Sequence, residues 1–249
     1  MKTNIYHITY TPDTRSASLR FWGCNMICLG CLCKEGVYDH LLKENRLEGS
    51  QRIVDSRKKP ERMLDLEEVI EYLSGLELER VFFTGEEASV DPHFGTITKV
   101  IHEKFHTENV LYTNGYDMAS IDDIDTIEVG IKAISEDLHL RYTGRPVGPV
   151  KENFIKYAAS GKKLTAASIL IPGLVEAEEI EKIALFIASV NKDIPFFVLP
   201  YFPAGDNPWR KTEPWEVEEA AQRVRKYLTH VSNCQGTDQE IVHDVERVF

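Results

Sequence analysis

The sequence of 249 residues lacks long apolar runs, and no stretch approaches the ~20 apolar residues that a helix needs to span a bilayer. The first six residues also lack the apolar run of a secretory signal peptide. Internal repeats, low-complexity tracts and linkers rich in Pro, Gly or Ser are absent too. We therefore expect a cytoplasmic protein with no membrane partner. A single domain over residues 1–249 is expected, with a core at about 15–205 and a C-terminal helix and tail at 206–249.

Positive charge is scarce as well. The chain has 29 Lys and Arg residues against 40 Asp and Glu residues, which gives a net charge of −11. Nucleic acids and anionic membranes are bound through basic surfaces, so this balance argues against both as partners. The basic run at 57–59, Arg-Lys-Lys, is only three residues long and is typical of a solvated loop rather than a nucleic-acid patch.

Cysteine is rare, with five in the chain, but four of the five lie between residues 24 and 33. A disulfide framework is not expected in a compartment that keeps thiols reduced, and crowded thiols indicate metal ligands. Cys24, Cys28 and Cys31 have the spacing CX3CX2C on a loop that follows a short strand-like segment. Three thiolates on one tight loop suit a metal cluster.

A zinc site is the alternative for these thiols, since Cys33 would complete four thiolates within ten residues. The Cys-x-Cys ending leaves little room for tetrahedral closure, and Cys33 is otherwise expected to be a bystander. Cys234 stands apart from this group. It is expected to be either a buried apolar residue or a second redox or substrate-facing thiol.

Strand and helix signals alternate along the chain. Strands are expected at 18–21, 80–84, 109–112, 127–132, 164–171 and 194–201. Helices are expected at 66–73 after an N-cap at Asp65, then at 93–105, near Met118, and at 149–159, 176–190 and 214–230, with helical character at 38–47. Alternation of this kind predicts an α/β fold with parallel strands, and a partial (β/α)6 TIM-like barrel fits six such units.

The carboxyl ends of parallel strands meet at one edge, where ligand sites gather. Six segments fall at such ends and would share one opening: the cysteine loop, Gly85-Glu86-Glu87, Thr113-Asn114-Gly115, Lys132, Pro172-Gly173 and Tyr201-Phe202.

The cysteine spacing and the order of these segments resemble the radical S-adenosylmethionine (SAM) superfamily over about residues 15–205. Within it, the chain resembles the small activating enzymes of the pyruvate formate-lyase type, which install a glycyl radical on a partner protein. The resemblance implies that Cys24, Cys28 and Cys31 hold a [4Fe-4S] cluster, one iron of which has no protein ligand and is taken by SAM.

Further motifs extend the resemblance. Residues 84–88, Thr-Gly-Glu-Glu-Ala, fall where the family has a Gly-Gly-Glu motif that binds the amino group of SAM. Lys132, His139 and Thr143-Gly144 resemble the activating enzymes' Asp-x-Lys and His-x-x-x-Thr-Gly. His139 on its own is typical of a helix residue with a local hydrogen bond. The implied cofactor-binding residues are Gly30, Gly85, Glu86, Glu87, Asn114 and Lys132, with Glu87 on the SAM ammonium and Lys132 on a carboxylate of SAM or substrate.

The chain also departs from the activating enzymes. Gly30 stands in place of an aromatic residue, and Glu86 in place of the second glycine. Gly130 and Tyr112 each stand where the activating enzymes carry an aspartate. Two further departures are residues 166–168, Ala-Ala-Ser, in place of an arginine and Phe202 in place of a histidine. Two carboxylates of the activating enzymes are therefore missing from this site.

The resemblance implies an enzyme that cleaves SAM reductively to a 5′-deoxyadenosyl radical, which abstracts a hydrogen atom. The substrate would be a partner glycyl-radical protein, and a one-electron reductant such as flavodoxin or ferredoxin would feed the cluster. No protein side chain is assigned a catalytic role, because the cofactors supply the chemistry. Two other hypotheses are a radical SAM enzyme that modifies a small molecule or a peptide side chain, and a non-catalytic zinc or Fe-S binding protein.

Overall fold

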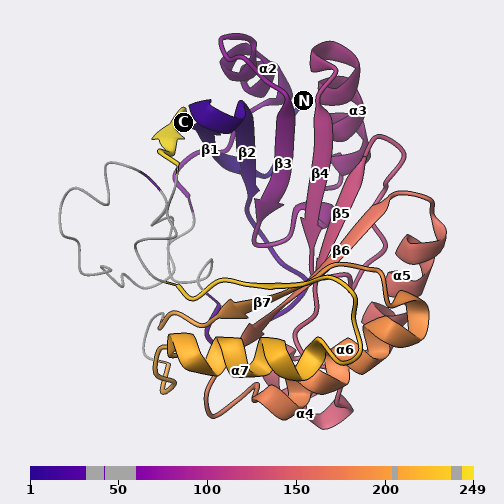
Figure 1. Cartoon of the computed structure of the whole chain (residues 1–249). Coiled ribbons are helices and arrows are strands. Elements are labelled where there is room, and N and C mark those ends of the chain that lie inside the picture. The colour runs from indigo at the N-terminus through magenta and orange to yellow at the C-terminus, as the bar shows by residue number, and fades with distance from the viewer. Residues whose placement is uncertain (32–41, 43–59, 204–206, 237–242) are drawn as a thin grey trace.

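The computed structural model of the chain describes residues 1–31, 42, 60–203, 207–236 and 243–249. Over these ranges nine strands form one sheet in the order β8-β7-β6-β5-β4-β3-β2-β1-β9 (Figure 1). Pairing is parallel from β2 to β8, whereas β1 is antiparallel to both β2 and β9. The strands are β1 (Ile5–Thr11), β2 (Ser16–Phe21), β3 (Arg80–Gly85), β4 (Glu108–Thr113), β5 (Thr126–Gly130), β6 (Lys163–Leu170), β7 (Phe196–Pro200), β8 (Val231–Asn233) and β9 (Glu246–Arg247).

The helices lie around the outer side of this curved sheet (Figure 1). They are α2 (Leu66–Ser74), α3 (Phe94–Phe105), α4 (Glu136–Thr143), α5 (Gly148–Ala159), α6 (Ala177–Asn191) and α7 (Pro214–Val224), with short 3-10 turns η1 (Pro12–Thr14) and η3 (Ala88–Val90). The core lies between sheet and helices, where alternate strand residues such as Val81 and Phe83 are fully buried. The parallel α/β architecture predicted from the sequence is confirmed.

The six predicted strands correspond to β2 through β7 and are neighbours in chain order. The predicted start of α2 is confirmed, since the Glu68 side chain accepts a hydrogen bond from the backbone N–H of Asp65 at 2.8 Å. Helices α3, α5 and α6 agree with prediction within one residue at each end. The predicted helical character at 38–47 lies outside the described residues, except for Leu42.

Two predicted helices differ from the structure. No helix forms near Met118, because the Asn114 side chain accepts the backbone N–H of Tyr116 at 2.9 Å, and the Tyr157 hydroxyl accepts that of Ala119 at 3.1 Å. These bonds hold the segment in bends and irregular backbone instead. Helix α7 ends at Val224 rather than near 230, and the chain then pairs as β8 with β7.

Three strands and one helix were not predicted as elements. Five consecutive buried residues open β1, so the strand lacks the alternation that marks a half-exposed strand. Strands β8 and β9 span only three and two residues. Helix α4 has a weak apolar face, although His139 within it was expected to be helical. Among the described residues, no helix has both the length and the apolar character needed to cross a membrane.

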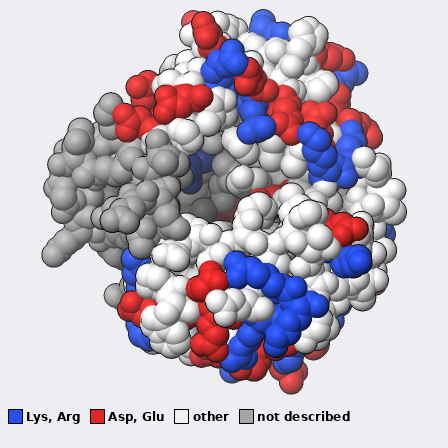
Figure 2. All heavy atoms as spheres, viewed as in Figure 1, with Lys and Arg blue, Asp and Glu red and all other residues white. Residues whose placement is uncertain are grey.

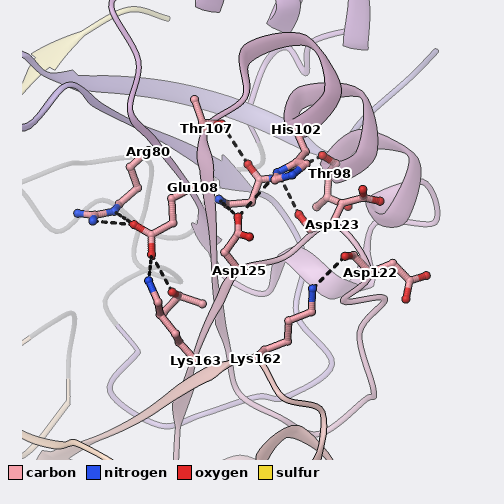
Figure 3. A network of polar contacts seen from close by, with 12 residues as sticks. Arg80, Thr98, His102, Thr107, Glu108, Asp122, Asp123, Asp125, Lys162 and Lys163 are labelled. Atoms are coloured by element: carbon pink, nitrogen blue, oxygen red, sulfur yellow. Dashed lines mark hydrogen bonds and ion pairs between the residues drawn. The ribbon is translucent and has the colours of Figure 1, made fainter.

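A polar network centred on Glu108 links neighbouring strands at their amino-terminal ends (Figure 3). Arg80 donates from Nε and Nη2 to Glu108 Oε2 at 2.8 and 2.7 Å. Thr126 and Lys163 donate to Glu108 Oε1 at 2.9 and 3.4 Å. One carboxylate therefore links β3, β4, β5 and β6 at their amino-terminal ends.

Replacing Glu108 with glutamine is expected to lower the free energy of unfolding at pH 7 by about 1 kcal/mol, as for a well-formed surface ion pair. Burial raises the pKa of Glu108, but the hydrogen bonds from Arg80, Thr126 and Lys163 outweigh it and leave the pKa below its ordinary value of 4.5. The carboxylate therefore stabilises the fold above pH 4.5 and loses this contribution as the pH falls through the folded-state pKa. Urea unfolding at several pH values measures the difference, which should vanish in acid; a constant difference would contradict the assignment.

Candidate active site

A cavity of about 280 Å³ lies at the carboxyl ends of β2 to β7. The space-filling view shows the molecule hollowed near its centre, with charged side chains inside (Figure 2). All nine site residues predicted from the sequence line this cavity: Cys24, Cys28, Gly30, Cys31, Gly85, Glu86, Glu87, Asn114 and Lys132. Tyr201 and Phe202 also line it, whereas the predicted Pro172-Gly173 turn does not. Segments that are up to 178 residues apart in the chain, from 24 to 202, thus meet at one opening, as parallel pairing requires.

The cysteine loop is anchored to the end of β3 on one side. Glu87 N–H donates to the Gly23 carbonyl at 3.1 Å, and Gly23 N–H donates to Glu86 Oε2 at 3.0 Å. Glu86 N–H donates to the Phe21 carbonyl at 3.1 Å. The two predicted motifs are therefore joined by reciprocal hydrogen bonds, so the position of one fixes the other.

The loop is held on its other side by the end of α4. Ile27 and Leu29 donate their backbone N–H groups to the carbonyls of Thr143 and Tyr142, both at 2.9 Å. Arg145 Nε donates to the Asn25 carbonyl at 2.7 Å. Because the flanks of Cys28 are bonded in this way, the thiol positions are set by the fold.

The His-x-x-x-Thr-Gly motif shapes that end of α4. His139 is fully buried, and its Nδ1 lies 2.7 Å from the Arg145 carbonyl, so Nδ1 must carry the proton that is donated. Thr143 Oγ1 donates to the His139 carbonyl at 2.8 Å and accepts from the backbone N–H of Arg145 at 3.1 Å. Burial also lowers the pKa of His139. The motif thus presents backbone carbonyls to the cysteine loop, and His139 has the local helical role expected of it.

Backbone and amide N–H groups point toward the sulfur of Cys24. Met26 N–H lies 3.4 Å and Asn114 Nδ2 lies 3.6 Å from Cys24 Sγ. Donors of this kind favour the thiolate over the thiol and tune a metal that it binds. In the described part of the chain, no group of three His, Cys, Asp or Glu side chains lies close enough together to hold a single metal ion. A [4Fe-4S] cluster instead spreads its thiolates over separate irons, so soft donors spaced along one loop fit it.

Glu87 is buried, with only 1% of its surface exposed. Its Oε1 accepts from Ser89 Oγ at 2.6 Å, Ser89 N–H at 3.3 Å and Thr113 Oγ1 at 2.9 Å, and its Oε2 accepts from Asn114 N–H at 2.7 Å. Burial raises the pKa of Glu87, while these hydrogen bonds oppose the rise. The carboxylate thus joins the end of β3 to the end of β4 and orients Asn114 beside Cys24.

Lys132 and Glu128 contribute opposite charges to the cavity wall. Glycine at 130 leaves room for Lys132, since a Cβ there would lie 3.3 Å from Lys132 Nζ. Glu128 accepts from Thr165 Oγ1 at 3.5 Å, and burial raises its pKa while Lys132 opposes the rise. Sequence reasoning missed Glu128, although its place two residues before Gly130 on β5 puts both on the same face of the strand.

Gly30 lies against Tyr201. A Cβ at Gly30, where φ is +72°, would lie 3.1 Å from the Tyr201 ring and hydroxyl. The Tyr201 ring thus occupies space that a side chain at position 30 would enter, which agrees with glycine at this departure from the family pattern. Cys234 follows β8 and does not line the cavity, and Cys33 lies outside the described residues.

The family model of the radical SAM superfamily matches residues 21–187, from the cysteine loop into α6. The chain belongs to the radical SAM superfamily. Members of this superfamily use a [4Fe-4S] cluster and SAM, and these are the cofactors of this enzyme. Family membership confirms the predicted radical SAM enzyme and favours it over a non-catalytic zinc or Fe-S binding protein.

Two curated relatives carry names of activating enzymes. A Methanocaldococcus jannaschii protein, proposed to be a glycyl-radical enzyme activating enzyme, is 25% identical over 240 residues, which cover 90% of this chain and 83% of that protein. The pyruvate formate-lyase-activating enzyme of Staphylococcus epidermidis is 28% identical over 113 residues, covering 42% of this chain and 45% of that enzyme. These radical SAM relatives agree with the activating-enzyme type that the motifs indicated.

Among solved structures, Streptococcus suis SuiB bound to S-adenosylmethionine superposes with a TM-score of 0.63 at 12% identity. The match covers 85% of this chain and 48% of SuiB, so this chain spans about half the length of SuiB. At this identity the similarity concerns the fold, which agrees with the partial TIM-like barrel predicted from the sequence.

Proposed function

We propose that this radical SAM enzyme abstracts a hydrogen atom from a glycine of a partner protein and so activates it as a glycyl-radical enzyme. The observation that carries the proposal is the similarity to a relative proposed to do this, which extends over 90% of this chain. The retained acid at Glu87 and the His-x-x-x-Thr-Gly motif support it. A one-electron donor such as flavodoxin or ferredoxin completes the proposed system.

Cys24, Cys28 and Cys31 would hold the cluster, since they supply three soft thiolates on a loop that is hydrogen-bonded on both sides. When bound, cluster and SAM together supply a 5′-deoxyadenosyl radical that abstracts hydrogen. The chain's own residues bind and orient SAM and exclude water. Gly85, with no side chain, allows β3 to approach β2 closely beneath the loop.

Lys132 would pair with a carboxylate of SAM or of the substrate. Lys132 lines the cavity and its charge acts on Glu128, but within the described residues no hydrogen bond or ion pair engages its ammonium group. A half-buried ammonium is stabilised by a charge-assisted bond to an anion. Gly30, Glu86 and Asn114 line the same cavity and would complete the SAM site.

The competing substrate hypothesis is a small molecule or a peptide side chain. Gly130 and Tyr112 remove two carboxylates of the activating enzymes, and Glu128 places a carboxylate elsewhere in the wall. A site rebuilt in this way favours a different substrate.

The test begins with anaerobic reconstitution with iron and sulfide, reduction, and addition of SAM. Formation of 5′-deoxyadenosine is expected, and a blank with an intact cluster would contradict enzymatic SAM cleavage. Candidate partner proteins are then added, and electron paramagnetic resonance (EPR) is used to look for a glycyl radical. A persistent blank with every partner, together with turnover of a metabolite, would decide for the small-molecule hypothesis.

Replacing Glu87 with glutamine is expected to raise the SAM concentration needed for half-maximal cleavage by about tenfold, because a charge-assisted hydrogen bond is lost. Iron content should not change. Thr113→Val is the matched control, since it removes one donor to the same carboxylate but keeps its charge. If the glutamine variant loses bound iron as well as SAM affinity, the role of Glu87 is to hold the cysteine loop in place, and the proposed contact with the SAM ammonium is wrong.

A further inference from the structure

Glu128 is a carboxylate of the cavity wall that has unused hydrogen-bonding capacity. It lies within β5, is half-buried and lines the cavity. Within the described residues its one hydrogen bond runs from Thr165 Oγ1 to Oε2 at 3.5 Å, well beyond the about 2.7 Å that is usual between two oxygens. A carboxylate taken out of water is costly unless donors or a cation reach it. Glu128 therefore differs from a carboxylate that only supports the fold.

Two other carboxylates of the same sheet show the contrast. Glu87 accepts four hydrogen bonds, and so does Glu108. The cations at the amino-terminal ends of the strands, Arg80 and Lys163, are engaged by Glu108. Of these three carboxylates, Glu128 is the one that lacks donors.

The charge of Glu128 is balanced only in part. Burial raises its pKa, and the Thr165 hydroxyl and the charge of Lys132 oppose the rise. Under the proposed function, Lys132 pairs with a carboxylate of SAM or of the substrate and is then shared with that anion. Arg20 lies on β2, which β3 and β4 separate from β5. A second cation would therefore stabilise the charged form of Glu128.

The strand register leaves Glu128 accessible from the opening. Gly130 and Ala167 are register partners two residues closer to the carboxyl ends, and both line the cavity. With no side chain and a single methyl group, they place little between the opening and Glu128. Asn114 and Lys132, which are proposed to contact SAM, follow the ends of β4 and β5, whereas Glu128 lies within β5. Glu128 is therefore a contact separate from those assigned to SAM.

An aromatic ring lies beside Glu128 on the neighbouring strand. Tyr112 is its register partner on β4 and also lines the cavity. The Tyr112 ring packs on Phe82, with ring centroids 5.5 Å apart, yet 38% of its surface stays exposed. An aromatic face attracts a cation, and a carboxylate beside it adds a charge-assisted hydrogen bond. The pair is suited to an ammonium or a guanidinium group.

We propose that Glu128 and Tyr112 form a subsite that binds a cationic group of the substrate. The inference rests on the proposed function, under which this group is a basic side chain of the partner protein close to the glycine that loses hydrogen. No bond forms or breaks at the subsite. Its role is to select a basic substrate and to orient it.

The probes are short peptides with a central glycine in an alanine and serine background. Arginine is placed at each other position in turn, and citrulline is its neutral counterpart. Calorimetric titration into the anaerobic enzyme, loaded with cluster and SAM, measures the affinities. The best arginine peptide should bind at least about tenfold more tightly than its citrulline counterpart, because a charge-assisted hydrogen bond is made only with arginine. In Glu128→Gln this ratio should fall to within about twofold of one.

Glu103→Gln is the matched control. Glu103 is exposed on α3 and does not line the cavity, and its substitution changes the net charge equally. This variant should keep the arginine-to-citrulline ratio of the parent within about twofold. Both peptides of a pair are measured on the same protein, so a loss of folded material does not change the ratio. If Glu128→Gln does not load iron, Glu128→Ser repeats the measurement.

Equal affinity of the arginine and citrulline peptides for the parent, including no measurable binding of either, would overturn the inference. It would also be wrong if Glu128→Gln kept the ratio and instead raised the SAM concentration needed for cleavage, since Glu128 would then bind SAM. Propylguanidine, which carries the cation without a peptide, should bind at least about tenfold more weakly than the best arginine peptide. Equal binding would support the subsite but assign the cation to a small substrate.

Failure of the proposed function gives a different result. An arginine preference that depends on Glu128, without a glycyl radical in any partner protein, would support the subsite and contradict glycyl-radical activation. A glycyl radical formed in a partner by an enzyme with no arginine preference would overturn the subsite alone.

Discussion

Replacing Cys28 with serine is expected to abolish SAM cleavage, lowering it at least about 100-fold, and to reduce bound iron from about four to below one per chain. The serine hydroxyl is a hard donor that does not replace a thiolate on an iron-sulfur cluster. The fold should survive, because the loop is held by the backbone N–H groups of Ile27 and Leu29 rather than by the thiol. Iron analysis and assay of 5′-deoxyadenosine measure both effects, and circular dichroism checks the fold.

Two cysteines outside the CX3CX2C motif are the controls. Cys234→Ser should keep full iron and activity, since Cys234 does not line the cavity. Cys33→Ser should do the same, because three thiolates suffice for a cluster that leaves one iron to SAM. Loss of metal in the Cys33 variant, with zinc in the parent protein, would instead support the four-thiolate zinc site.

Replacing Gly85 with alanine is expected to destabilise the protein by at least about 3 kcal/mol. Its φ of +112° is strained for any residue with a side chain, and an added Cβ would lie 2.5 Å from both the backbone nitrogen and the carbonyl oxygen of Phe21. Neither contact can be relieved by a side-chain rotation, so β2 and β3 must separate. The cysteine loop starts directly after β2, and cluster loading should therefore fall together with stability.

Gly161→Ala provides the comparison. Gly161 also has a positive φ, +79°, but an added Cβ there meets nothing within 4 Å. The variant should pay only the backbone cost of about 1 kcal/mol and should keep its iron. Denaturant unfolding measures the free energy of unfolding of both variants. The loss in Gly161→Ala reports backbone strain alone, and the additional loss in Gly85→Ala reports the steric clash with Phe21. Equal losses in both would mean that the close approach of β3 to β2 has no energetic consequence.

Sequence reasoning located β3, β5 and β6 because each is a short, largely apolar run that ends at a turn, which is typical of a buried parallel strand. It also grouped the site residues correctly, because parallel strands end at the same edge. The turn at Pro172-Gly173 was the exception. A Cβ added at Gly173 would lie 3.2 Å from the Trp209 ring. The backbone N–H of Gly173 donates to the Glu176 side chain, so this glycine forms part of a separate turn.

Other features of the site depend on contacts that no local pattern carries. The sequence indicates an acid at Glu87, but its four donors come from Ser89, Thr113 and Asn114 on two different elements. In the same way, the His-x-x-x-Thr-Gly motif gives no sign that its carbonyls hold the cysteine loop across more than 110 residues of chain. Such hydrogen bonds are decided by tertiary packing and become visible only in the fold.

The most direct test of the account compares EPR spectra of the reduced, anaerobically reconstituted enzyme with and without SAM. If Cys24, Cys28 and Cys31 hold the cluster as proposed, one iron is left for SAM, so the account predicts a cluster signal whose g-values shift when SAM is added. Substituting serine for Cys28 should remove the signal. A purified protein that carries zinc, or a cluster spectrum unchanged by SAM, would contradict the account.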